Sequence, residues 1–256
     1  MPWTFAHPAA ILPLRRIGPL RLPMGALVVG SISPDIFYYF GIFSVATFAH
    51  TTAGIFMVCL PVGAACLALF YLVRGPVLNL LPQPHRDAIQ RATSHDGQHR
   101  SRAYLLQAAG LVAGAATHTI WDAFTHVTGY AVQSIAILRI PVARIAGHEL
   151  YLFHILQHAS TVLGVAILIG VYTHWLRRQP TVLATQPGAE RIRLTILAGC
   201  GVLAVVMAFL ISFATGVSGS SLVFRVAIYA TSTFGICIIA AALIYRACSD
   251  LLSKSG

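Results

Sequence analysis

The chain has 256 residues, of which 57% are hydrophobic and only 9% are charged. Soluble domains have about a quarter of their residues charged, so this composition excludes a soluble globular protein and indicates an integral membrane protein. The formal net charge of +10 comes from 17 Lys and Arg residues against 7 Asp and Glu residues. In a membrane protein such an excess belongs to cytoplasmic loops and anionic lipid headgroups, and no basic run with interleaved aromatic residues supports nucleic acid as a partner.

The N-terminal part of the chain begins with a segment that is not a membrane span. Prolines and glycines interrupt residues 1–23, which predicts a short helix over 8–16 inside a surface-lying or re-entrant segment. Residues 24–43 are about twenty mostly apolar residues and form the first predicted span, interrupted at Ser33-Pro34-Asp35. A second apolar run, 52–73, starts just after His50.

Four further apolar runs follow in the rest of the chain. Residues 74–102 predict a basic loop, and a mixed segment of modest polarity is expected to pack back on the protein as a loop over 127–151. The runs are 104–124, 152–176, 194–215 and 222–245. The sequence therefore predicts an all-α fold, a multi-pass helical membrane protein with about six transmembrane helices. We divide it into a helical membrane domain with the metal site over 1–176, a basic linker over 177–193 and a C-terminal helix pair over 194–256.

The distribution of arginine predicts the orientation. Arginines are frequent in residues 1–23, 74–102 and 177–193 and recur in the C-terminal tail, whereas the connections 44–51 and 216–221 have no charged residue. Positively charged segments remain on the cytoplasmic side, so we expect a cell-membrane protein with both termini in the cytoplasm. This orientation would start His7 on the face opposite to the end of the third span. Either the N-terminal segment is re-entrant, or the first apolar run does not cross the membrane in this way.

Ionisable residues inside the apolar runs are the candidates for function. The stretch His118-Thr-Ile-Trp-Asp122-Ala-Phe-Thr-His126 has potential metal ligands at i, i+4 and i+8, on one face of a helix. At membrane depth an ionisable group costs several kcal/mol unless it is paired, hydrated or bound to metal. Two helical turns span about 12 Å, too far for one ion to contact all three residues. Either two ions share Asp122, or the helix ends near Thr125 and the chain turns His126 back.

Several blocks of the sequence together resemble a known family. They are Pro2-Trp-Thr-Phe-Ala-His7-Pro-Ala, Ser33-Pro34-Asp35, Phe48-Ala-His50-Thr, the His118–His126 stretch and Gln157-His158-Ala-Ser. Over residues 1–165 they are similar to small bacterial membrane proteins grouped as domain of unknown function 4184. That resemblance implies no settled activity.

A more distant resemblance is to membrane-bound metal-dependent hydrolases and to zinc-dependent phospholipase C. Those helical enzymes have ligands in the order His, Asp, His, His-x-x-x-Asp, His, which is matched here by His7, Asp35, His50, His118, Asp122 and His126. They continue with His-x-x-x-Glu, where this chain has His154-x-x-x-His158. They also use an N-terminal Trp, whereas Trp3 is not terminal. These departures put one position of a three-zinc site in doubt.

The resemblance and the buried ionisable residues lead to one main hypothesis. It is a membrane-embedded hydrolase that acts on a phosphoester or another lipid-borne ester, with membrane lipid as its surroundings and a divalent metal, zinc, as its cofactor. Asp35 would bind metal or act as general base, and the expected metal ligands are His7, Asp35, His50, His118, Asp122, His126 and His158.

Other interpretations of the same residues remain open. The protein could be a carrier of protons or metal ions, a haem protein with paired histidine ligands, or a degenerate hydrolase scaffold without catalysis. Each block also has a purely structural explanation. Ser33-Pro34-Asp35 is typical of a helix start, His118 and Asp122 could be a plain i, i+4 pair, and His126 could be a C-terminal helix residue.

Overall fold

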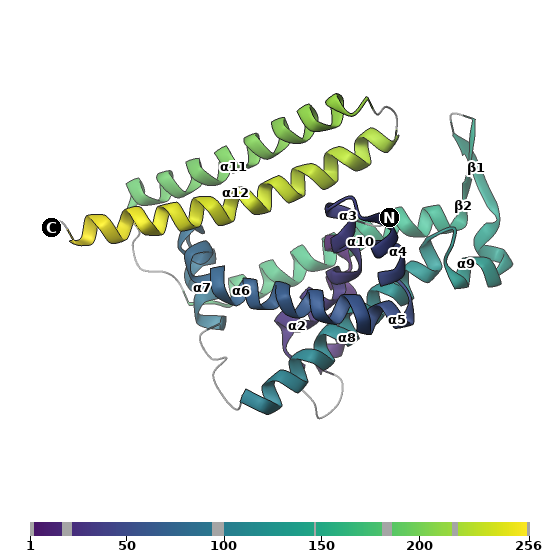
Figure 1. The fold of residues 1–256 in the computed structure, drawn as a ribbon, viewed down its shortest axis with the longest axis horizontal. Helices are drawn as coiled ribbons and strands as arrows, with labels where there is room; N and C mark the ends of the chain where they lie inside the picture. The colour runs from purple at the N-terminus through teal and green to yellow at the C-terminus, as the bar shows by residue number, and fades with distance from the viewer. Residues whose placement is uncertain are drawn as a thin grey trace. The chain divides into compact units, whose positions relative to one another are not determined.

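The computed structural model describes residues 3–16, 22–93, 100–145, 147–180, 186–216 and 220–254, and the described chain is helical over most of its length (Figure 1). The first fifty residues form short helices, which are η1 (Thr4–Ala6), α1 (Pro8–Ile11), η2 (Pro13–Arg16), α2 (Met24–Ile32), η3 (Ser33–Asp35), α3 (Ile36–Tyr39) and α4 (Phe43–Ala49). A continuous helix over Thr52–Leu80 follows, composed of α5 (Thr52–Gly54), the π-helical η4 (Ile55–Cys59) and α6 (Leu60–Leu80).

The remaining elements include one small β-hairpin. The helices are α7 (His85–Thr93), α8 (Arg100–Thr125), α9 (Tyr130–Ser134), η5 (Ala136–Arg139), α10 (Leu152–Arg177), α11 (Pro187–Ala214) and α12 (Ser220–Lys254). The strands β1 (Pro141–Ile145) and β2 (His148–Tyr151) pair antiparallel, with Arg144 opposite Glu149. The expected all-α class is therefore confirmed, with the hairpin as its only sheet among the described residues.

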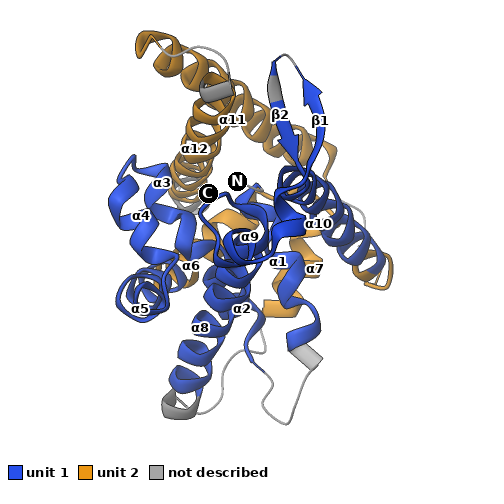
Figure 2. Ribbon diagram, turned by 90° about the vertical axis from the view of Figure 1, so that its right-hand side faces the viewer, with its two compact units in different colours: residues 1–67, 98–174 blue, residues 68–97, 175–256 orange. Residues whose placement is uncertain are grey.

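Two compact units make up the chain (Figure 2). Residues 1–67 and 98–174 form unit 1, and residues 68–97 and 175–256 form unit 2. In unit 2, α11 packs along α12. The start of α11 is tied to the end of α6, since Arg193 Nε donates a hydrogen bond to the carbonyl oxygen of Asn79 at 3.0 Å. The division of the sequence at residues 176 and 193 stays a prediction, and residues 181–185 of that linker lie outside the described residues.

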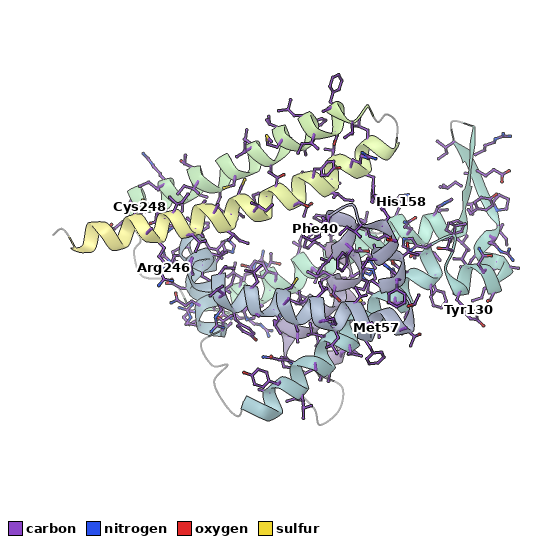
Figure 3. All side chains as sticks on the ribbon, in the orientation of Figure 1. Phe40, Met57, Tyr130, His158, Arg246 and Cys248 are labelled. Atoms are coloured by element: carbon purple, nitrogen blue, oxygen red, sulfur yellow. The ribbon has the colours of Figure 1, made fainter. Side chains whose placement is uncertain are left out.

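Four helices are long and apolar enough to cross a membrane, so the protein is a membrane protein. They are Thr52–Leu80, Leu152–Arg177, Pro187–Ala214 and Leu222–Cys248, and they correspond to the second, fourth, fifth and sixth predicted spans. Many of their large apolar side chains are exposed, Met57 among them (Figure 3). Phe40 and Tyr130, which lie outside these helices in unit 1, are exposed as well. Such exposure is normal for side chains that face lipid.

The other two predicted spans are not among these four. Residues 24–43 do not form one helix, because α2 ends at Ile32 and Pro34, which lacks a backbone N–H, starts a tight η3 turn. Helix α8 has 26 residues and is long enough, but its polar residues, His118 and Asp122 among them, lower its hydropathy. Six spans are thus an expectation that the described residues meet only in part.

Two segments expected to be loops contain regular structure. Within 74–102, α6 continues to Leu80 and α7 follows, with Asp87 in its first turn and Arg91 in its last, as the helix dipole favours. Within 127–151, α9, η5 and the hairpin replace the expected loop. Their apolar residues Val132 and Leu138 pack against Phe153 at the start of α10.

Close packing of α2 on α8 positions the centre of unit 1. Glycines permit it, because a Cβ at Gly30 would collide with the backbone of Leu111, and a Cβ at Gly114 would collide with the backbone of Leu27. Gly110 and Gly114 form a small-xxx-small pair of the kind that brings membrane helices together. One turn beyond Gly114, His118 therefore reaches the backbone of α2.

The N-terminal segment is held against α10. The backbone N–H of Trp3 donates a hydrogen bond to Thr161 Oγ1 at 3.1 Å. Gly164, one turn along, leaves room for η1, because a Cβ there would lie 2.8 Å from the carbonyl oxygen of Ala6. These contacts fix the backbone on both sides of Thr4 and lead directly to His7.

Candidate metal centre

Six ionisable side chains from separate segments of unit 1 meet at one place. Each lies at or near the end of a helix, where the backbone changes direction and the side chain can point inward. His7 joins η1 to α1, Asp35 ends η3, His50 follows α4, and the last two turns of α8 and the residue after it supply the other three, His118, Asp122 and His126.

Four of these side chains form the tightest group. Asp35 Oδ1 lies 3.4 Å from His50 Nε2 and 3.6 Å from His118 Nε2. Asp122 Oδ2 lies 3.4 Å from the same atom of His50 and 3.3 Å from that of His118. All four ligand-type atoms lie within 4.8 Å of one another, so the group could hold a metal ion.

These separations match the spacing of ligand atoms around a single ion. Zinc binds imidazole nitrogen and carboxylate oxygen at about 2.0–2.2 Å, so neighbouring ligand atoms in a tetrahedral site lie about 3.4 Å apart. The four carboxylate–imidazole distances of 3.3–3.6 Å fall around this value. Two imidazoles and two carboxylates are also a donor set that zinc and similar divalent ions accept.

The polar atoms at this place are buried without hydrogen-bond partners in the described part of the chain. Five such atoms belong to these residues, namely His7 Nε2, Asp35 Oδ1, His118 Nε2, Asp122 Oδ1 and His126 Nε2. A buried polar atom without a partner costs stability, and nearly all such atoms in proteins are satisfied. Such a concentration of buried, unpartnered polar atoms is what a group of side chains that could hold a metal ion would show.

Backbone carbonyl groups select the imidazole tautomer that metal binding needs. His118 Nδ1 lies 2.7 Å from the carbonyl oxygen of Ser31, and His50 Nδ1 lies 2.7 Å from that of Ala46. A carbonyl oxygen only accepts, so each Nδ1 carries the donated hydrogen, and in the neutral ring each Nε2 presents its lone pair to the centre.

Asp122 connects the four-residue group to the two remaining histidines. Its Oδ1 lies 3.6 Å from His7 Nε2, while its Oδ2 lies 3.5 Å from His126 Nδ1. The His7 ring stacks on the His118 ring with centroids 3.7 Å apart. Helix α8 ends at Thr125, and the His126 backbone N–H still donates to the Asp122 carbonyl oxygen at 3.0 Å, so His126 contacts Asp122 as an i, i+4 neighbour. Asp122 Oδ1 thus faces His7, whereas its Oδ2 faces His50, His118 and His126.

The histidines differ in charge and in access to solvent. Burial, with the neighbouring His118, lowers the pKa of His7 to about 4, so His7 is neutral at pH 7. Burial also acts to lower the pKa of His50, but the Asp122 and Asp35 carboxylates outweigh it and raise the pKa to about 9. The side chains of His50 and His126 are 19% and 24% exposed, whereas that of Asp35 is fully buried. His50 and His126 are therefore the most exposed of the six side chains.

One predicted ligand is not part of this arrangement. His158 lies on α10 with an exposed side chain, and it makes none of the described ion pairs that join the other six residues (Figure 3). Its neighbour Gln157 is the buried residue of that block. Thr4, which contacts Asp35, is not among the residues predicted from the sequence. Its only signal was its place three residues before His7, inside the first resembling block.

The fold and the centre define a helical membrane protein with a buried His/Asp group that could hold a metal ion. The chain belongs to the family described as domain of unknown function (DUF4184), whose model matches residues 1–249. This match extends past residue 165, where the resembling sequence blocks end, and includes α11 and most of α12. No curated protein and no solved structure matches the chain.

Proposed function

We propose that this protein is a membrane-embedded, metal-dependent hydrolase that cleaves a phosphoester or another lipid-borne ester at a one- or two-metal His/Asp centre. The observation that carries the proposal is that Asp35, His50, His118 and Asp122 place ligand-type atoms 3.3–3.6 Å apart. Two of these atoms, Asp35 Oδ1 and His118 Nε2, are buried without a hydrogen-bond partner in the described part of the chain. A divalent ion, zinc in this proposal, supplies a nucleophile at neutral pH by lowering the pKa of a bound water, and polarises the ester oxygen.

The first ion would be held by the tight group of Asp35, His50, His118 and Asp122. A second ion would be held by His7, His126 and Asp122, whose Oδ1 faces His7 and whose Oδ2 faces His126 as well as the first group. The two-fold use of Asp122 resolves the problem that His118 and His126 are too far apart on α8 for one ion. His158, exposed on α10, is left out of the proposed ligand set.

Asp35 fits the role of ligand better than that of general base. Its Oδ2 accepts a hydrogen bond from Thr4 Oγ1 at 2.6 Å, and its Oδ1 faces His50 and His118. Neither oxygen remains to take a proton from water. In this proposal Asp35 binds and orients, and the accessible side near His50 and His126 receives the substrate.

The surroundings of that accessible side support a substrate with an apolar part. The Tyr38 ring lies 6.0 Å from the His50 ring and 5.9 Å from the Phe43 ring, and Phe43 is 54% exposed. An aromatic path thus leads from the metal ligand His50 to the outside. Pockets for lipid-like ligands combine such apolar walls with a few polar groups.

The membrane orientation in this proposal follows from the shared centre. His50 directly precedes the span Thr52–Leu80, so the chain has to recross the membrane before Asp122 can meet His50. Helix α8, about 39 Å long, is long enough to do so. The arginine-rich segments 74–102 and 177–193 and the C-terminus then lie in the cytoplasm, with the centre on the opposite face of the cell membrane. The contact of His7 with Asp122 supports a re-entrant N-terminal segment rather than an N-terminus in the cytoplasm.

A second candidate function is a metal-binding scaffold without catalysis. Structural zinc sites use four protein ligands, whereas catalytic sites keep an open position for water. The tight group supplies four protein ligands, and a tetrahedral ion bound by all of them would have no open position. The two candidates differ in whether metal-loaded protein turns over any ester.

Metal analysis of purified protein is the first test of both candidates. We expect one to two tightly bound divalent ions per chain in lipid nanodiscs, and hydrolysis of a chromogenic phosphodiester or of phospholipid vesicles that stops on chelation and returns with zinc. Less than one ion per chain would overturn the metal centre. Bound metal without turnover of either substrate would favour the scaffold. The matched control is His158→Ala, which should bind and turn over like the wild type.

A further inference from the structure

Thr4 and Asp35 form a buried hydrogen bond across 31 positions of sequence. The Thr4 hydroxyl donates to Asp35 Oδ2 at 2.6 Å, and the two residues are 6% and 0% exposed. A hydrogen bond from a neutral hydroxyl to a carboxylate is short and strong when both groups are away from water. Packing alone does not require a hydroxyl at this place.

The bond decides how Asp35 presents its two oxygens. A carboxylate can turn about its last torsion angle, which is broad in side chains that end in such a group. With Oδ2 engaged by Thr4, Oδ1 is the oxygen that faces His50 Nε2 and His118 Nε2, and it has no hydrogen bond in the described part of the chain. The Thr4 bond therefore holds Asp35 in the orientation that the tight group needs.

Thr4 is itself fixed by contacts on both sides. The preceding residue, Trp3, is hydrogen-bonded to Thr161, and the Ala6 backbone lies against Gly164 of α10. The short η1 turn between them leaves Thr4 little freedom. The position of its hydroxyl is thus set by α10, an element that supplies none of the six converging side chains.

We propose that Thr4 is a positioning residue of the metal centre, acting through Asp35. The inference rests on the proposed function only in requiring that the centre binds a divalent ion, and it does not depend on which ester, if any, is cleaved. Groups that orient metal ligands in this way typically change metal affinity by 10–100-fold when they are removed.

The test compares Thr4→Val, Thr4→Ala and Thr4→Ser in nanodiscs, with zinc affinity and the visible spectrum of the cobalt-substituted protein as readouts. Val retains the shape without the hydroxyl, Ala removes the side chain beyond Cβ, and Ser restores the donor. The matched control is Thr119→Val on α8, whose hydroxyl bonds only to the carbonyl oxygen of Ala115 in its own helix. We expect Thr4→Val and Thr4→Ala to bind zinc about 10–100-fold more weakly with an altered cobalt spectrum, and Thr4→Ser and Thr119→Val to match the wild type.

The possible outcomes separate this inference from the proposed function. Wild-type protein that binds no zinc overturns the proposed function and the inference with it. Wild-type protein that binds zinc, together with unchanged affinity and spectrum in Thr4→Val, overturns the inference alone. If Thr4→Val does not fold, Thr4→Ala against Thr4→Ser decides by the same criterion. Equal loss in Thr4→Ser shows that packing matters and the hydroxyl does not, which also overturns the inference.

Discussion

His118 and Asp122 lie one turn apart on α8 with Nε2 and Oδ2 separated by 3.3 Å, yet Nε2 of His118 has no hydrogen-bond partner among the described residues. An i, i+4 pair with a purely structural role would align as a hydrogen bond. Both atoms instead face the same point as Asp35 and His50. This relationship is the one expected of a group that could hold a metal ion.

The first prediction concerns this pair. His118→Ala and Asp122→Ala should each abolish binding of the first ion, because each removes a ligand and leaves its partners buried without compensation. Metal content after gel filtration, measured per chain, checks this result. His154→Ala, also on a helix of unit 1, is the control and should retain the wild-type content. Full metal content in either ligand variant would remove these residues from the shell.

A second prediction separates the two ions. His7→Ala and His126→Ala should reduce the metal content by about one ion per chain and leave the first ion bound, since neither residue belongs to the tight group. Stepwise titration with zinc in nanodiscs measures both affinities. Should His7→Ala lose all bound metal, the division into two binding positions is wrong and His7 belongs to the first.

Metal binding should also depend on pH in a defined direction. In the metal-free protein His50 has a pKa of about 9 and is protonated at pH 7, whereas metal binding requires a neutral imidazole. Zinc must therefore displace a proton, and apparent affinity should fall by at least about tenfold for each pH unit below 9. Titrations at several pH values in a non-chelating buffer check this slope. An affinity that is flat between pH 7 and 9 would contradict the protonated state of His50.

A fourth prediction tests the packing that positions the centre. Gly114→Ala should destabilise the protein by about 1–3 kcal/mol or more, because the added Cβ meets the backbone of Leu27 and overpacked sites relax poorly. The control is Gly170→Ala on α10, where an added Cβ has open space and alanine favours the helix. Thermal unfolding in detergent compares the two. Equal midpoints for both variants would mean that α2 and α8 are not in close contact.

Much of the metal centre could be predicted from the sequence, because charged groups in apolar runs are costly and therefore conspicuous. Asp35, His118 and Asp122 are conspicuous because they are ionisable residues within apolar runs. The spacing of His118 and Asp122 places those two residues on one face of α8. The break at Pro34, which allows Asp35 to leave the α2 axis, is also visible in the sequence. The expectation that the helix ends near Thr125 matches α8.

Other parts could not be predicted, for physical reasons that involve contacts distant in sequence. His158 has the residue type of a ligand, but only the rotation of α10 decides which face is buried, and there it is Gln157. Thr4 is an ordinary polar residue until Asp35 lies beside it. The count of six spans is not confirmed where apolar length and helix continuity differ, as in residues 24–43, where α2 has only nine residues.

The converging side chains come from positions 7 to 126, so an ion bound among them would act as a cross-link over more than a hundred residues of chain. Closing so long a loop restricts the unfolded ensemble far more than it restricts the folded one. During synthesis the link could form only after α8 had been made, which leaves the first segment untethered until that moment. Metal supply would then govern not only chemistry at the centre but also how long the newly made N-terminal segment stays exposed to membrane proteases.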